Sequence, residues 1–77
     1  MMKVTEMAVA DARARGYDVM IVDDAGYYWE ESFSGEWIVS TEYGWELDPH
    51  AFDGAEVISE NYCDEEKICY IRIAGEF

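Results

Sequence analysis

The chain has 77 residues and a mass of 8.9 kDa, which allows one small domain and excludes two. Hydrophobic residues make up 51% and aromatic residues 16%, a composition that supports a buried core and excludes a disordered acidic tail. Eighteen Asp and Glu against five Lys and Arg give a net charge of −13, which opposes direct binding to nucleic acids or to anionic membranes, because both would repel the protein.

The sequence contains no targeting signal that we recognise. No apolar run approaches the roughly 20 residues that span a bilayer, and the first residues do not form the apolar segment of a signal peptide. We therefore expect a cytoplasmic protein, in which Cys63 and Cys69 stay reduced. Their spacing matches neither a redox C-x-x-C motif nor a zinc site.

Residues 3–15 are rich in good helix formers and are predicted to form the one helix. Thr5 is a candidate N-cap, and Gly16 is a favoured residue just after a helix. One stripe of the helix is expected to pack on the core. It consists of Val4, Met7, Ala8 and Ala12.

After Gly16, β-branched and aromatic residues predominate, and residues 17–23 are predicted to form a central strand with apolar side chains on both faces. A turn at 24–26 leads to the clearest hairpin of the sequence, formed by residues 27–33 and 36–43.

The register of this hairpin follows from its aromatic side chains. A three-residue loop, Ser34–Gly35–Glu36, gathers most of them on one face, and one buried face fixes the pairing of strands. The expected pairs are Phe33 with Trp37, Trp29 with Thr41, and Tyr27 with Tyr43. The opposite face, turned to solvent, carries Tyr28, Glu30, Ser32, Ile38, Ser40 and Glu42.

Residues 44–55 interrupt the β pattern, and Asp48 followed by Pro49 is the N-cap and first-turn pair of a short helical turn. A second hairpin, of undetermined register, is expected from 55–62 and 67–77. The predicted fold is therefore a single α+β domain over residues 1–77, with one N-terminal helix packed on an antiparallel sheet of about four or five strands.

The distribution of charge is the most unusual feature. From Gly16 through Glu66 the sequence has fifteen carboxylates and no Lys or Arg. Charges of the same sign repel one another and destabilise a fold. We therefore expect this acidic stretch to have a role other than folding. Strands lie about 4.8 Å apart and residues i and i+2 about 6.6 Å, so a sheet face can hold carboxylates in an array that attracts a basic groove.

A small, strongly acidic α+β protein of this kind resembles the phage-encoded inhibitors that act as DNA mimics, including anti-CRISPR proteins. The likeness rests on size, charge and the layout of the carboxylates over the whole chain. It implies a partner with a basic nucleic-acid-binding surface, such as a CRISPR effector complex or another nuclease, in the cytosol of the host cell. The candidate contact residues are Asp23, Asp24, Tyr28, Glu30, Glu31, Glu36, Glu42, Glu46, Asp48, Asp64, Glu65 and Glu66.

Enzymatic chemistry has little support in the sequence. The many carboxylate pairs are not specific for acid–base catalysis, and the phosphate-binding glycine motifs are missing. Asp48, His50 and Asp53 share one loop, but their spacing does not match a calcium-binding loop, and loose association of cations is the expected behaviour. We expect neither catalytic residues nor a cofactor nor a specific metal site.

Two other functions remain open. The protein is alternatively an immunity protein or antitoxin that neutralises a basic toxin without copying DNA, or a domain whose acidity is an adaptation to high salt. The high charge opposes self-association, so a monomer or a weak homodimer is expected.

Overall fold

The computed structural model describes residues 5–39, 44–48 and 50–75. The single helix, α1, spans Thr5–Ala14, where the good helix formers lie. It ends as predicted at Gly16, whose φ of 85° only glycine adopts without strain. The N–H of Gly16 donates to the Arg13 carbonyl and that of Tyr17 to the Ala12 carbonyl, which completes a Schellman C-cap. No helix among the described residues is both long and apolar enough to cross a membrane.

Six strands form one sheet in the order β4-β3-β2-β1-β6-β5. Their bounds are β1 Asp18–Val22, β2 Tyr28–Glu31, β3 Trp37–Val39, β4 Glu46–Leu47, β5 Val57–Cys63 and β6 Ile68–Ile73. The predicted α+β class, with one helix on a sheet, is confirmed, and β1 is central as expected. The sheet has six strands instead of four or five, and it is mixed, because β1 and β6 run parallel while the other neighbours are antiparallel.

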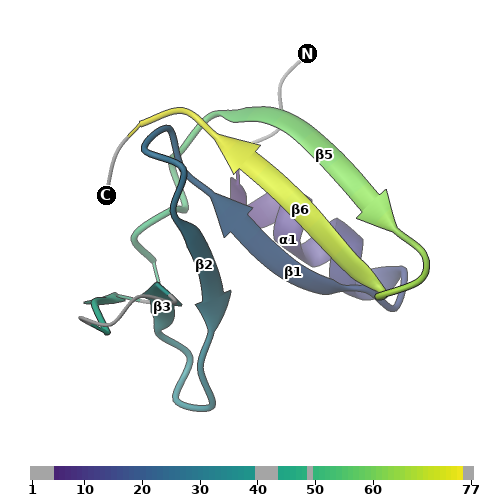
Figure 1. Ribbon diagram of the computed structural model, residues 1–77, viewed down its shortest axis with the longest axis horizontal. Helices are drawn as coiled ribbons and strands as arrows, with labels where there is room; N and C mark the ends of the chain where they lie inside the picture. Colours follow the sequence, from purple (N-terminus) through teal and green to yellow (C-terminus); the bar gives the residue numbers. More distant parts are fainter. Residues whose placement is uncertain (1–4, 40–43, 49, 76–77) are drawn as a thin grey trace.

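Helix α1 covers only one face of the sheet, and no helix of the described residues lies over the other face (Figure 1). The side chains of β1 show this division, because Val19 and Ile21 are buried whereas Met20 and Val22 are partly exposed. We call the uncovered side the open face. The core on the helix side contains Ala8, Val9, Ala12, Val19, Ile21, Trp29, Trp37, Val39, Phe52, Val57, Cys69, Ile71 and Ile73.

The stripe that α1 buries is rotated by one residue from the prediction. Met7 is 60% exposed, so its predicted place in the core was wrong, while Thr5 and Val9 are buried beside Ala8 and Ala12. The Thr5 hydroxyl donates to the Ala55 carbonyl oxygen at 2.9 Å and so attaches the start of the helix to the segment before β5. Val4 lies outside the described residues.

The register of the β2–β3 hairpin differs from the predicted one by two residues. Trp29 pairs with Val39 and Glu31 with Trp37, so the loop is Phe33–Ser34–Gly35. Glycine decides this register, because the third residue of such a loop is left-handed and Gly35 has φ of 92°. A shift by two leaves each residue on its predicted face, but it places Phe33 in solvent. The predicted partners Thr41 and Tyr43 lie outside the described residues.

The segment after β3 contains a short strand that the sequence analysis missed. Glu46 and Leu47 form β4 against β3, with Leu47 opposite Trp37. Asp48 acts as the predicted cap, since its Oδ1 accepts the N–H of His50 at 2.9 Å. The residues after it form successive turns, in which Ala51 bonds back to Asp48 and Asp53 to His50, instead of a helix.

Candidate functional site

One end of the sheet collects six of the twelve predicted contact residues. The parallel strands β1 and β6 begin side by side, where Asp18 pairs with Ile68. The antiparallel strands β2 and β5 end there, at Glu31 and at Cys63. The topology therefore brings together carboxylates from two hairpins that are distant in sequence. We call this the acidic end, and it consists of Asp18, Glu30, Glu31, Glu36, Asp64, Glu65 and Glu66.

Hydroxyl groups hold several of these carboxylates in place. Glu36 accepts hydrogen bonds from Ser34 and, at 3.1 Å, from Ser32. The bond from Ser34, followed by those from the backbone and from Ser32, lowers the pKa of Glu36, so this group stays ionised in mild acid. Asp64 accepts a hydrogen bond from the Tyr17 hydroxyl.

The β5–β6 hairpin has a similar contact within itself. The Tyr70 hydroxyl donates to Glu66 Oε1 at 2.9 Å, and this bond raises the pKa of Tyr70, because loss of its proton would leave two negative charges in contact. Glu65, at the tip of the loop, is exposed. The acidic end therefore presents negative charge in fixed positions on two loops.

The basic side chains nearby are already engaged within the chain. Arg13 forms an ion pair with Glu31, with 2.6 Å between Nη2 and Oε2. Arg15 lies 3.9 Å from Asp11 and over the ring of Tyr62. Lys67 lies over the ring of Tyr17, 5.0 Å from its centre. Among the described residues, Glu31 is therefore the one carboxylate of the acidic end with an ion-pair partner.

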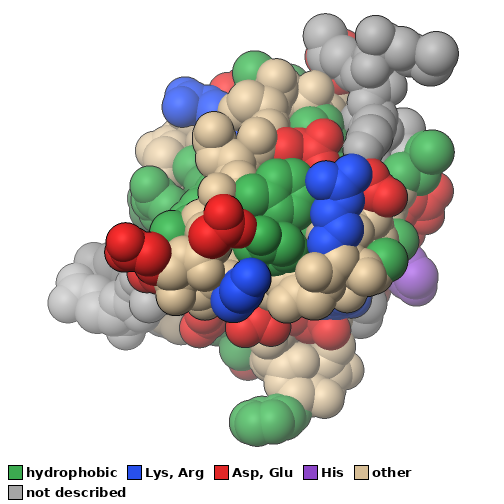
Figure 2. Space-filling model, turned by 90° about the vertical axis from the view of Figure 1, so that its right-hand side faces the viewer, with side chains coloured by type: hydrophobic (Ala, Val, Ile, Leu, Met, Phe, Trp, Pro, Cys, Tyr) green, Lys and Arg blue, Asp and Glu red, His purple; other side chains and the backbone are tan. Residues whose placement is uncertain are grey.

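Figure 2 views the molecule from the side on which β5 and β6 are joined. Hydrophobic side chains gather in the middle of this face with basic side chains next to them, and acidic side chains lie around this centre. The tyrosines Tyr17 and Tyr62 form an edge-to-face pair, with ring centres 4.9 Å apart. The two cation–π contacts hold Arg15 against the ring of Tyr62 and Lys67 against the ring of Tyr17.

Two further predicted residues, Glu46 and Tyr28, lie on the open face or at its margin, together with Glu30 of the acidic end. Glu30 and Glu46 flank Ile38 in adjacent strands, so both carboxylates are on the side away from the helix. Tyr28 is 49% exposed, and its ring meets that of Tyr70 edge-to-face. The expected open surface with carboxylates and a tyrosine is therefore present. Glu42, which was expected to complete it, lies outside the described residues.

Asp23 is not a surface residue. Its side chain is fully buried, and it accepts hydrogen bonds from the Tyr27 N–H at 3.0 Å and from Trp29 Nε1 at 2.8 Å. These bonds close the β1–β2 turn, so Asp23 has a structural role and is removed from the set of exposed carboxylates. Asp24 is exposed, and its Oδ2 accepts the N–H of Gly75 at 2.8 Å.

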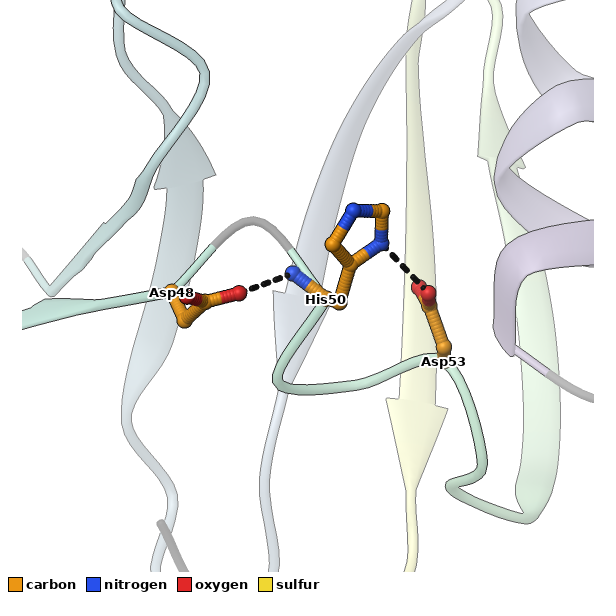
Figure 3. Close-up of polar contacts among 3 residues, drawn as sticks. All are labelled: Asp48, His50 and Asp53. Carbon is orange, nitrogen blue, oxygen red and sulfur yellow. Dashed lines mark hydrogen bonds and ion pairs between the residues drawn. The ribbon is translucent and has the colours of Figure 1, made fainter.

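The loop containing Asp48, His50 and Asp53 holds the single histidine (Figure 3). His50 Nδ1 lies 2.7 Å from Asp53 Oδ2, while Asp48 binds the His50 backbone instead of the ring. The contact with Asp53 raises the pKa of His50, and Asp48 adds a smaller effect in the same direction. Within the described ranges, no group of three or more His, Cys, Asp or Glu is arranged to hold a metal ion.

The sequence analysis missed Asp18 and Arg72 as surface features. Asp18 joins the acidic end only because β1 and β6 are parallel neighbours. Arg72 lies on the open face near the C-terminal ends of β1 and β6, between Val22 of β1 and Ser59 of β5. The alternation of Ile68, Tyr70 and Arg72 along β6 is the signal that places these residues on one face.

Comparison of the chain with models of known protein families, with curated proteins and with solved structures finds no match.

Proposed function

We propose that this protein is an inhibitor that binds the basic nucleic-acid-binding surface of a partner and blocks access of DNA to it. It has no catalytic role in this proposal and acts in the cytoplasm. By the resemblance stated above, the partner is a CRISPR effector complex or another nuclease.

The observation that carries the proposal is the acidic end. Carboxylates of the β2–β3 and β5–β6 hairpins are fixed at one end of the sheet, while Arg13, Arg15 and Lys67 beside them are held in internal contacts. Folding alone does not require this arrangement, because each added carboxylate increases self-repulsion. Recognition of a cationic surface benefits from it.

The mechanism is competition for one binding surface. Glu30 and Glu46 lie on the open face on either side of Ile38, two strand spacings or about 10 Å apart, and both belong to the sheet instead of a flexible tail. The negative field attracts a Lys- and Arg-rich groove and speeds association, and the rigid sheet excludes DNA once it is bound. The serine and tyrosine contacts to Glu36, Asp64 and Glu66 limit the conformational entropy lost on binding.

The first experiment is capture of partners from host lysate with the tagged protein, identification by mass spectrometry, and challenge with duplex DNA at constant salt. We expect a basic nucleic-acid-binding protein that DNA displaces. A partner that DNA does not displace would contradict mimicry and favour an immunity protein. Absence of any partner would favour the salt-adapted domain.

Charge-reversal variants then locate the contact surface. Glu30→Lys and Glu65→Lys change exposed residues of the acidic end, and Glu56→Lys makes the same change in charge at the start of β5, at the opposite end of the sheet. We expect each of the first two to weaken partner binding at least tenfold and Glu56→Lys to have a smaller effect. Equal losses in all three variants would show that net charge alone matters, without a defined contact surface.

A further inference from the structure

The open face carries a cation that the fold does not use. Arg13, Arg15 and Lys67 each contact a carboxylate or an aromatic ring. Arg72 is exposed on β6, and no carboxylate of the described residues lies within ion-pair distance of its guanidinium group. In a chain of net charge −13, an arginine to which the described residues offer no ion pair is unexpected for a purely structural role.

Arg72 lies in a hollow that is suited to a ligand group. The hollow has a volume of about 330 Å³, and its lining combines the guanidinium with a hydroxyl, an amide and two tyrosine rings. Those rings, Tyr28 and Tyr70, form an edge-to-face pair with centres 6.3 Å apart. The lining residues are Val22, Tyr28, Ser59, Asn61, Tyr70 and Arg72.

Apolar side chains extend the hollow along the sheet. Met20, Val22 and Ile38 are only partly buried, because no helix covers this side (Figure 1). An apolar sheet face of this kind gains free energy when a second surface excludes water from it. The hollow and these side chains therefore belong to one larger surface, with Glu30 between Met20 and Ile38, on which another molecule can pack.

The charge pattern of the open face defines what that molecule presents. Arg72 is a cation near the C-terminal end of β6, and Glu30 and Glu46 lie on the same face toward β4. Glu66 is held beside Tyr70. A surface with one cation among several carboxylates is complementary to a surface with one carboxylate among several cations.

We propose that the open face binds a segment of a partner protein in which a carboxylate, next to an apolar side chain, is surrounded by Lys and Arg. This inference rests on the proposed function, since it takes the basic partner as the occupant. The carboxylate pairs with the guanidinium of Arg72, a geometry that allows two parallel hydrogen bonds. The apolar side chain packs on Tyr28 and Val22, and the cations face Glu30, Glu46 and Glu66.

The effect of removing the charge of Arg72 distinguishes recognition of a partner carboxylate from simple attraction between opposite charges. Against a uniformly cationic partner, removal of the positive charge of Arg72 would strengthen binding. If Arg72 pairs with a partner carboxylate, removal of its charge weakens binding instead.

Two blocked peptides test this with the protein alone, by NMR titration. The first is Lys-Lys-Leu-Glu-Lys-Lys, and the control is Lys-Lys-Leu-Gln-Lys-Lys, which carries one more net positive charge. We expect the Glu peptide to bind about threefold more tightly and to shift the resonances of Tyr28, Ser59 and Arg72. Arg72→Gln is expected to reverse the preference, and Arg15→Gln, which removes the same charge on the helix side, is expected to keep it.

Each other outcome overturns the inference. A preference of the wild-type protein for the Gln peptide, or absence of shifts on the open face, excludes recognition of a carboxylate there. Equal shifts with inorganic phosphate would assign the hollow to phosphate, and concentration-dependent shifts without peptide would assign the face to a second copy. Failure of the proposed function would give a different result. Neither lysine-rich peptide would then cause salt-dependent shifts in the resonances of the acidic end.

Discussion

The two faces of this sheet are built from the same strands, yet their charged side chains differ in burial and in the partners that the fold provides. On the helix side, Asp23 is fully buried and its carboxylate accepts two hydrogen bonds from within the β1–β2 turn. On the open face, the described part of the chain provides no ion-pair partner for Arg72. A charged group whose hydrogen bonds are all made within the chain stabilises the fold, whereas an exposed charged group without such partners is available to bind another molecule.

The first prediction has the largest expected effect. It compares how much side chains on the two faces contribute to the free energy of unfolding. Trp29 is 1% exposed and packs on Phe52, whereas its neighbour Tyr28 on the open face is about half exposed. Trp29→Ala is expected to lower the free energy of unfolding by about 3–5 kcal/mol. Tyr28→Ala should cost about 1 kcal/mol or less. Denaturant titration measures both, and equal losses would refute the distinction between the faces.

The second prediction concerns the buried carboxylate. Asp23→Asn leaves one acceptor oxygen for two donors, and its new amide group faces the indole N–H of Trp29, so we expect a loss of about 1–3 kcal/mol. Asp24→Asn is the matched control, because its oxygen can still accept the Gly75 N–H at the surface. Its expected cost is below about 0.5 kcal/mol. If the two variants unfold at the same denaturant concentration, Asp23 is not the structural acceptor described above.

The third prediction concerns how salt changes the thermal stability of the protein through its exposed carboxylates. Raising NaCl from 10 to 150 mM shortens the Debye length from roughly 30 to about 8 Å and screens repulsion among carboxylates. We expect the protein to be folded at both concentrations. A gain of about 0.5 kcal/mol in the free energy of unfolding would raise the melting temperature by a few degrees at 150 mM. A protein that is unfolded at 10 mM salt would instead indicate a domain adapted to high salt. Thermal melts followed by circular dichroism measure this.

The smallest effect concerns the exposed pair of His50 and Asp53. Their contact raises the pKa of His50, so its stabilising contribution is fully present below the ordinary histidine value of 6.5 and is lost as pH rises through the raised value. Asp53→Asn should lower the pKa of His50 toward 6.5, and Asp48→Asn should lower it less. An NMR titration of the His50 ring checks the order of these shifts. The same pKa in all three proteins would exclude the contact in solution.

Local features of the sequence were sufficient to predict the parts of the fold that depend on neighbouring residues. Gly16 ends the helix because only a residue without a Cβ adopts its backbone conformation easily. The strand at 17–23 follows from its β-branched residues. The β2–β3 hairpin was placed correctly, but its register was wrong by two residues, because the prediction weighed burial of Phe33 above the backbone requirement at Gly35.

The candidate site was less predictable, because it depends on pairing between distant strands. No local pattern indicates that β1 lies parallel to β6, and this pairing places Asp18 in the acidic end and Arg72 beside Val22. Asp23 was expected at the surface because of its charge. Its burial depends on the N–H groups of Tyr27 and Trp29, which reach it only after the turn has formed.

The parallel contact between β1 and β6 also constrains how this chain folds. The parallel pair joins residues about fifty positions apart, as in Asp18 with Ile68 and Val22 with Arg72. Its formation must overcome the entropy of closing that long loop, which slows folding in proteins dominated by distant contacts. During synthesis, β1 can pair with β2 once both strands have emerged, but its other edge remains unpaired until β6 has left the ribosome. Until then the hydrophobic strand β1 is exposed, and mutual repulsion among the carboxylates that follow it helps to keep nascent chains from aggregating.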